Sequence, residues 1–442
     1  MKKARVYLVM LFAMFMFSGC SVVNVEELYS LPQPQEEYLQ LQKLINKEIA
    51  AGGEYSAPTL GSRRQSVQLT DLDGDGADEA LVFLRDKNAQ PQICIYCKNA
   101  ANQYALIATI EGDGAAVGHV EYADFNGDGI SEIAVSWKMN EEMRLLELYS
   151  IKNWTTTALL TIRCTDFQTV DIDSNGMPEL MSVNLDGEGG DVSMIRASLD
   201  GEVITTSTRL SKSLANIERF RVGYIAEKVP AVFVEGRFPN NNSEALLTDI
   251  IIYSDEKLKN IMLDSTTGDS RATRRYPVYC TDIDGNGTID VPFAEKLKNH
   301  PKASVDYYIF DWFNYYADGD REICASTYHC YNDDWYFELP PNWRNNLMVR
   351  RETALAGERS VTFSTVDENS GKITDLMTIY VLSDENRNDR AKLDGRFILL
   401  GGETIIYAAE FNTDDRVTKE QKQDIIQRFH LIYSEWITGD LG

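Results

Sequence analysis

Residues 71–79 read Asp71-Leu72-Asp73-Gly74-Asp75-Gly76-Ala77-Asp78-Glu79, and this loop decides the fold because the chain repeats it in variant form. The second, third and fourth loops begin at positions 124, 171 and 282. They read Asp124-Phe125-Asn126-Gly127-Asp128-Gly129-Ile130-Ser131-Glu132, Asp171-Ile172-Asp173-Ser174-Asn175-Gly176-Met177-Pro178-Glu179 and Asp282-Ile283-Asp284-Gly285-Asn286-Gly287-Thr288-Ile289-Asp290. Each has an acid or amide at loop positions one, three and five, glycine at six and an acid at nine. Four copies of one pattern indicate a repeated structural unit.

Alternating oxygen-bearing side chains can converge on one centre because the glycine at position six permits a sharp turn. Ca2+ binds about six to eight oxygens and tolerates irregular geometry. Without a cation, clustered carboxylates would repel one another or take up protons. The loops therefore predict one Ca2+ ion each, up to four in all, held by the side chains at positions one, three, five and nine and the carbonyl at position seven. The predicted ligands are Asp71, Asp73, Asp75, Ala77 and Glu79; Asp124, Asn126, Asp128, Ile130 and Glu132; Asp171, Asp173, Asn175, Met177 and Glu179; and Asp282, Asp284, Asn286, Thr288 and Asp290.

Two other interpretations of the loops are weaker. An EF-hand needs flanking helices and a bidentate Glu at position twelve. Here the flanks alternate like strands, and position twelve is Val82, Val135, Ser182 and Phe293. Acidic turns without metal are the second alternative, because Asp, Asn and Gly favour turns. Four copies with the same acidic positions argue against a chance set of turns.

The sequence around the loops alternates with the period of two that is typical of strands. The loops recur at a spacing of about fifty residues, with a copy missing between the third and the fourth. Residues 229–234 and 248–253 fill that gap with strand-like sequence that has no loop. An all-strand repeat of this length is typical of a β-propeller. The predicted class is mainly β, a calcium-binding propeller of about five to seven blades.

The N-terminus has the organisation of an export signal over residues 1–19. Positive charges precede an apolar run that is short for a membrane span. Residues 17–20, Phe-Ser-Gly-Cys, resemble the lipobox of bacterial lipoproteins, which implies lipidation of Cys20 and an anchor on the extracytoplasmic face of the bacterial cell membrane. A plain secretory signal is the alternative. Residues 20–35 have the composition of a tether.

The remainder divides into two predicted domains. Residues 36–330 form the propeller, opened by a helix over residues 36–50. Residues 331–442 form a small α+β domain, in which a final helix begins at a capping box of Thr418 and Gln421 and covers an antiparallel sheet. The apolar face predicted for that helix is Ile425, Phe429, Ile432 and Trp436.

Residues 68–76 and 123–129 resemble the FG-GAP or VCBS repeats of integrin-α-type β-propellers, and the resemblance covers about residues 60–300. It implies Ca2+ and blade structure, but no activity, since such repeats occur in adhesins, binding proteins and accessory domains of enzymes. Asn175 and Asn286 at position five, and Ser174 where the family usually has glycine, imply weaker binding. The C-terminal part resembles the PsbP/Mog1-like α/β sandwich, and the whole layout resembles a VCBS-repeat lipoprotein.

Charge and motifs limit the function. The formal net charge of −25 disfavours nucleic acid as a partner. The sequence holds no GxSxG, HExxH or P-loop motif, and its histidines have no metal-ligand spacing. The predicted function is therefore a monomeric, non-enzymatic binding or scaffold protein for a surface protein or a glycan, touching the membrane only through its lipid. A surface carbohydrate-active enzyme and a purely structural envelope component remain alternatives.

An aromatic run is the best ligand-site candidate outside the loops. Exposed aromatic faces bind sugars and proteins, but the same residues could fill the seam between the two predicted domains, which is the favoured interpretation. The run comprises Tyr307, Tyr308, Phe310, Trp312, Phe313, Tyr315, Tyr316, Tyr328, Tyr331, Trp335 and Tyr336.

Overall fold

The computed structural model describes residues 36–432, except residues 142, 153, 240–244, 277 and 413–416. The predicted signal, Cys20 and the tether lie outside the described residues. Within the described part, every helix is too short or too polar to cross a bilayer.

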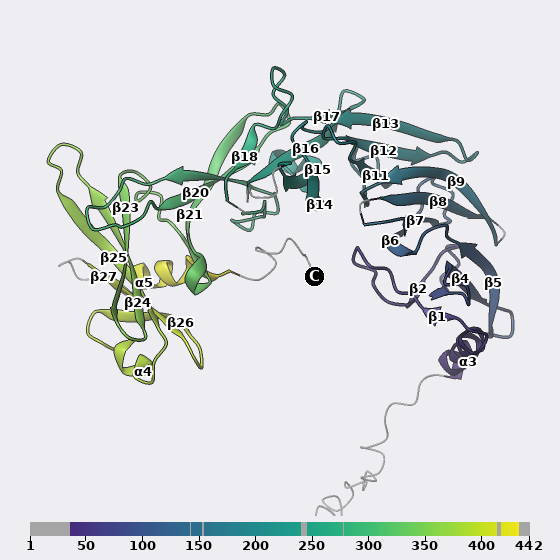
Figure 1. The fold of residues 1–442 in the computed structure, drawn as a ribbon, viewed down its shortest axis with the longest axis horizontal. Helices are drawn as coiled ribbons and strands as arrows, with labels where there is room; N and C mark the ends of the chain where they lie inside the picture. The colour runs from purple at the N-terminus through teal and green to yellow at the C-terminus, as the bar shows by residue number, and fades with distance from the viewer. Residues whose placement is uncertain are drawn as a thin grey trace, which may run out of the picture.

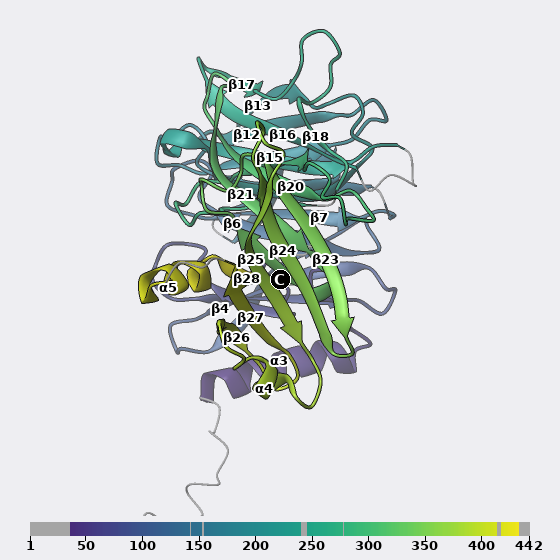
Figure 2. The ribbon, with the colours of Figure 1, turned by 90° about the vertical axis from the view of Figure 1, so that its left-hand side faces the viewer.

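The predicted mainly-β class is confirmed. Six antiparallel sheets follow one another along the chain, and Figure 1 shows them arranged along an open arc, with the first sheet on one arm and the sixth on the other. Figure 2 views the array from one end, with the sixth sheet nearest the viewer. The residues that the structure describes form neither a closed barrel nor a closed propeller ring.

The first three sheets each carry one loop between their first two main strands. The helix α3 (Glu36–Ala50) precedes them, as predicted, and buries Leu41 and Ile45 against the first sheet. The first sheet contains β1 (Glu54–Tyr55), β2 (Val67–Thr70), β3 (Glu79–Arg85), β4 (Pro91–Lys98) and β5 (Tyr104–Glu111). The second contains β6 (Ala116–Ala123), β7 (Glu132–Lys138), β8 (Arg144–Lys152) and β9 (Thr155–Cys164). The third contains β10 (Asp166–Val170), β11 (Glu179–Asn184), β12 (Asp191–Ala197) and β13 (Val203–Arg209).

The other three sheets complete the arc. The fourth contains β14 (Asn216–Tyr224), β15 (Pro230–Arg237), β16 (Leu246–Ser254), β17 (Lys257–Asn260) and β18 (Ala272–Arg274), with the turn η1 (Ala226–Lys228). The fifth contains β19 (Val291–Lys296), β20 (Tyr308–Tyr315), β21 (Arg321–Cys330), β22 (Trp335–Glu338) and β28 (Phe429–Leu431), with the turn η2 (Tyr331–Asp333). The sixth contains β23 (Leu347–Leu355), β24 (Glu358–Val366), β25 (Ile373–Leu382), β26 (Arg396–Gly401) and β27 (Ile406–Phe411). The helix α4 (Arg387–Arg390) lies between β25 and β26 in sequence, and α5 (Lys419–Gln427) follows β27.

The central strands are buried on both faces because each sheet packs between its neighbours. The strands β3 and β7 are buried along six of their seven residues. After an initial glutamate β3 is a continuous apolar run, and the apolar run of β7 is interrupted only by the buried Ser136. The two strand-like segments without a loop became β15 and β16 of the fourth sheet, which confirms that this part of the repeat kept its strands.

The final helix is shorter than predicted. The capping box of Thr418 and Gln421 is present, but α5 ends at Gln427. Phe429, assigned from the sequence to the helix face, begins β28 instead and pairs with β22 in the fifth sheet. Its ring packs on Trp335, with centroids 5.5 Å apart. Burial of this aromatic pair at the open edge of β22 outweighs the helical pattern. Because β22 and β28 lie in the same sheet as β21, the predicted domain boundary after residue 330 falls inside that sheet.

The aromatic run is divided among three cores. Tyr307, Tyr328 and Trp335 pack in the core that the fifth sheet shares with the sixth. Phe310 and Trp312 pack with Val278 and Ala325, and Phe313 and Tyr315 join a core with strands of the fourth sheet. Six members of the run are buried: Phe310, Trp312, Tyr315, Tyr328, Trp335 and Tyr336. The seam interpretation is therefore confirmed for part of the run only.

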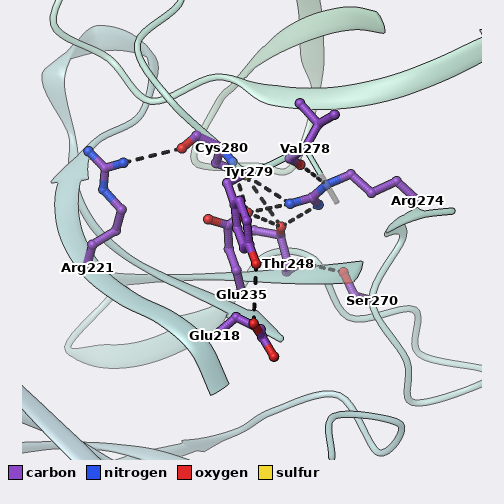
Figure 3. Close-up of polar contacts among 9 residues, drawn as sticks. All are labelled: Glu218, Arg221, Glu235, Thr248, Ser270, Arg274, Val278, Tyr279 and Cys280. Atoms are coloured by element: carbon purple, nitrogen blue, oxygen red, sulfur yellow. Dashed lines mark hydrogen bonds and ion pairs between the residues drawn. The ribbon is translucent and has the colours of Figure 1, made fainter. Parts of the chain in front are cut away.

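The fourth sheet has no loop but contains a buried ion pair, which Figure 3 shows. The side chains of Arg274 and Glu235 are at most 1% exposed. Arg274 also donates from Nη1 to Thr248 Oγ1 over 2.7 Å. Glu235 Oε1 accepts the backbone N–H of Cys280 over 2.9 Å. The pair thereby joins β15, β16, β18 and the segment that leads to the fourth loop.

Candidate metal centres

Each loop is positioned by the strand that follows it. Glu79, Glu132 and Glu179, the acids at position nine, are the first residues of β3, β7 and β11, and Asp290 directly precedes β19. All four acids are at most 2% exposed. Positions four to six of every loop are exposed, so a buried carboxylate lies behind an accessible turn.

The four loops close by the same two kinds of hydrogen bond. The position-one carboxylate accepts the N–H of the glycine at position six, over 2.9, 2.8, 2.9 and 2.8 Å in chain order. The glycines have φ angles of 87°, 85°, 89° and 79°, which a residue with a side chain rarely adopts. The acid at position nine accepts the N–H of position two over 2.9, 3.0, 3.0 and 3.0 Å. The repeated sequence therefore gives a repeated conformation.

Three loops bring acidic groups together. In the first loop, Asp71, Asp73 and Glu79 place carboxylate oxygens within 4.8 Å of one another. Asp171, Asp173 and Glu179 do the same in the third loop. In the fourth, the matching set is Asp284, Asp290 and the Cys324 thiol.

The second loop differs because position three is an amide. Asn126 Nδ2 donates to Glu132 Oε1 over 2.6 Å, so the amide covers the buried acid. Asp124 and Asp128 lie in the same loop, yet among the described residues they join no group of three convergent acids.

The residues at positions five and seven hold the turn. Asp75, Asp128, Asn175 and Asn286 each accept the backbone N–H of position seven, over 2.7, 3.0, 2.7 and 2.7 Å. The donors are Ala77, Ile130, Met177 and Thr288, whose carbonyls were predicted as ligands.

The buried acids sit in surroundings that disfavour negative charge. Burial, together with Asp124 and Asp128, raises the pKa of Glu132 to about 7. Burial likewise raises the pKa of Asp290 to about 6, with the nearby Asp282 and Asp284 adding to the shift. The pKa of Glu79 is also raised, mainly by burial. A bound cation would offset the repulsion between carboxylates that contributes to these raised pKa values.

The fourth loop gives a direct test of whether a cation fits. Asp282 Oδ1 and Asp290 Oδ1 are buried and have no hydrogen-bond partner in the described part of the chain. A buried carboxylate oxygen without a donor is uncommon in a folded protein, and a bound cation is one group that would satisfy it. The oxygen donors present fit Ca2+, whose preferred ligands are carboxylates and carbonyls.

The sequence did not identify the side chains that reach the loops from the next strand. Arg196 of β12 contacts the third loop, and Cys324 of β21 lies beside the fourth. In the first sheet, burial raises the pKa of Cys97 to about 11, and Glu79 next to the thiol adds to the shift. These contacts depend on strand register, which the loop motif does not contain.

Two of the histidines, His119 and His329, are buried in the sheets. His119 is buried between Glu121 and Asp166, with Nε2 3.0 Å and Nδ1 3.3 Å from their carboxylates. Burial lowers its pKa, but the two hydrogen bonds outweigh that effect and raise it to about 9. The charged ring thus links β6 to β10 across two sheets. His329 is buried in the fifth sheet, which lowers its pKa to about 3.

Comparisons with known proteins add no family. No protein-family model matches the chain, and no curated protein matches it. A hypothetical selenium-binding protein from Sulfolobus tokodaii has a TM-score of 0.29 at 10% identity, over 76% of this chain and 77% of its own. AofleA from Arthrobotrys oligospora has a TM-score of 0.26 at 6% identity, over 75% of this chain and 91% of its own. At these TM-scores neither structure informs the function of this chain.

Proposed function

We propose that this chain is an extracytoplasmic binding or scaffold protein whose sheets are stabilised by calcium. The observation that carries the proposal is one loop repeated four times, with a buried acid at its ninth position. Asp71, Asp73 and Glu79 would hold the ion in the first loop, and the orphaned oxygens of Asp282 and Asp290 would contribute in the fourth. Bound calcium supplies a divalent charge that offsets carboxylate repulsion and ties each turn to its central strand.

The same proposal covers the architecture and location. We propose that the loop-bearing sheets are VCBS or FG-GAP blades in an open arrangement, and that Cys20 is lipidated and anchors the chain outside the cytoplasm. Two observations support this: the lipobox-like residues 17–20, and the loop that precedes the central strand β3, β7 or β11 of three successive sheets. Extracellular calcium modules need only weak sites, with Kd of about 10⁻⁴–10⁻³ M.

The partner is proposed to be a surface protein or a glycan. Purified protein with Ca2+ is expected to bind a component of a glycan array, or a surface protein in a pull-down, without degrading polysaccharide. The physical reason is that the convergent carboxylates are placed to hold a cation, which leaves them unavailable as an acid and base pair. Product formation that a single carboxylate substitution outside the loops abolishes would instead establish the carbohydrate-active enzyme.

Changing Cys20 to Ser is expected to release the protein from the membrane fraction, because the serine hydroxyl cannot take the thioether-linked lipid. Wild-type and C20S protein are compared by fractionation and immunoblot in a bacterial host. Ser18→Ala, a change that keeps a small residue before the cysteine, serves as the control and should remain with the membrane. A C20S protein that stays in the membrane fraction would contradict the anchor.

A further inference from the structure

The third loop differs from its sister loops because a cationic side chain lies against its acids. Arg196 donates from Nε to Glu179 Oε1 over 3.0 Å and from Nη2 to Asp173 Oδ2. These are the acids at positions nine and three. The Arg196 side chain is 31% exposed, so the ion pairs are partly shielded from water.

We infer that the guanidinium of Arg196 takes the place of calcium in the third loop, which therefore carries a built-in cation and binds no ion. This inference rests on the proposal that the sister loops bind calcium. It reduces the expected capacity from four ions to at most three.

Charge and geometry support the replacement of calcium by the Arg196 guanidinium. Arginine remains protonated and offers a planar fork of donors, which suits two carboxylates at once. Two of the three convergent acids of the third loop thereby share one hydrogen-bonded counter-charge, which offsets a single negative charge, and Asp171 has no contact with the guanidinium in this set. A Ca2+ ion entering the loop would meet a positive charge within a few ångströms, so the arginine would have to leave first.

Arg196 is held in this position from its other side. Its guanidinium lies 5.0 Å from the centre of the Tyr253 ring, which belongs to β16 of the fourth sheet. A cation over an aromatic ring is attracted by the electron-rich face of the ring. Displacing the arginine would therefore break a contact between two sheets as well as its ion pairs.

Strand register explains why the position-nine acid of the third loop has an arginine opposite it, whereas those of the first and second loops do not. Leu180 pairs with Ile195, so the acid at position nine falls opposite Arg196 on the next strand. The equivalent pairs are Ala80 with Tyr96 in the first sheet and Ile133 with Tyr149 in the second. The residues that follow those partners are Cys97 and Ser150, which carry no positive charge. The cross-strand position, rather than the loop motif, thus determines which cation the loop holds.

The test measures calcium bound per chain, by equilibrium dialysis, in the wild-type protein and in variants. Glu79→Gln should lose about one ion, because it removes a ligand of the first loop. Glu179→Gln should bind the wild-type number, because the third loop holds none. Arg196→Gln should gain about one ion, since it frees Asp173 and Glu179. The calcium-dependent rise in melting temperature should also be larger in Arg196→Gln than in the wild type.

Arg209→Gln is the matched control. Arg209 lies in the same sheet, and its partners Asp186 and Asp191, 2.7 and 3.3 Å away, are outside the loop. This variant should bind as much calcium as the wild type. A gain of calcium in Arg209→Gln would show that loss of any positive charge on the sheet suffices, and would overturn the inference.

The outcomes separate this inference from the calcium proposal. If Glu179→Gln loses an ion, the third loop binds calcium and the inference is wrong, while the calcium proposal stands. That variant also decides the matter if Arg196→Gln does not fold. If the wild type binds no calcium, the calcium proposal fails. Arg196→Gln is then still informative, because a gained ion supports the built-in cation and no gain contradicts it.

Discussion

Removing calcium is expected to lower the melting temperature of this protein by about 10–30 °C, and adding it back should restore the melt. An ion that binds only the folded loops stabilises by about 2.7 kcal/mol when present at a hundred times its Kd. For domains of this size, 1 kcal/mol corresponds to about 2–4 °C. Two or three occupied loops therefore give the expected shift, measured by differential scanning calorimetry with and without chelator.

Magnesium is the control for this experiment, because it demands near-octahedral geometry and dehydrates reluctantly. It should restore little of the melting temperature.

The raised pKa values of two loop acids also determine how stability changes with pH. The folded pKa values of Glu132 and Asp290, about 7 and about 6, lie above those of the free side chains. In chelator their contribution to stability should therefore grow as the pH falls from about 8 to about 5, while the gain from calcium shrinks. A melt unchanged by chelator would remove the calcium proposal.

Replacing Arg274 by Met is expected to reduce the free energy of unfolding by about 3–5 kcal/mol, the usual cost of leaving one partner of a buried ion pair alone. Glu235 is fully buried and would lose its counter-charge (Figure 3). Thr248 would also lose the donor that now lies 2.7 Å from its hydroxyl. The change is measured by urea unfolding at saturating calcium, so that the loops do not contribute to the difference.

The matched control is Arg237→Gln in the same sheet. Arg237 pairs with Glu218 over 3.0 Å, but both side chains are partly exposed, so the loss should be at most about 1 kcal/mol. The double variant Arg274→Met with Glu235→Leu should recover much of the stability, because it removes the unpaired charge as well. An Arg274→Met protein as stable as the wild type would show that Glu235 is protonated or solvated.

The loop motif predicted what is local to the chain. Gly76 and its equivalents need a positive φ, and Asp71 accepts the N–H of that glycine, so six consecutive residues already determine the turn. The helix over residues 36–50 was likewise predictable from its apolar spacing. The contacts that the sequence did not predict join residues that are far apart in the chain or depend on strand pairing. Arg196 reaches Glu179 only through the pairing of β11 with β12, and Phe429 leaves its helical pattern only because β22 offers an edge.

The open arc could not be foreseen for a related reason. A repeat of about fifty residues predicts that successive sheets stack, but closure depends on the small rotation between neighbouring sheets. Side chains at the packed faces set that rotation. Residues such as His119, which joins β6 to β10 through Asp166, act at this level, and their partners become visible only in three dimensions.

The pairing of β28 with β22 has a consequence for the order in which the protein is made. The strands β19 to β22 are synthesised about a hundred residues before β28. One edge of their sheet therefore stays unpaired until the sixth sheet has been synthesised. Only when residue 431 has been synthesised can that edge close. Completion of the fifth sheet therefore requires that the sixth has already been made, and a chain truncated before residue 429 would leave the edge of β22 unpaired.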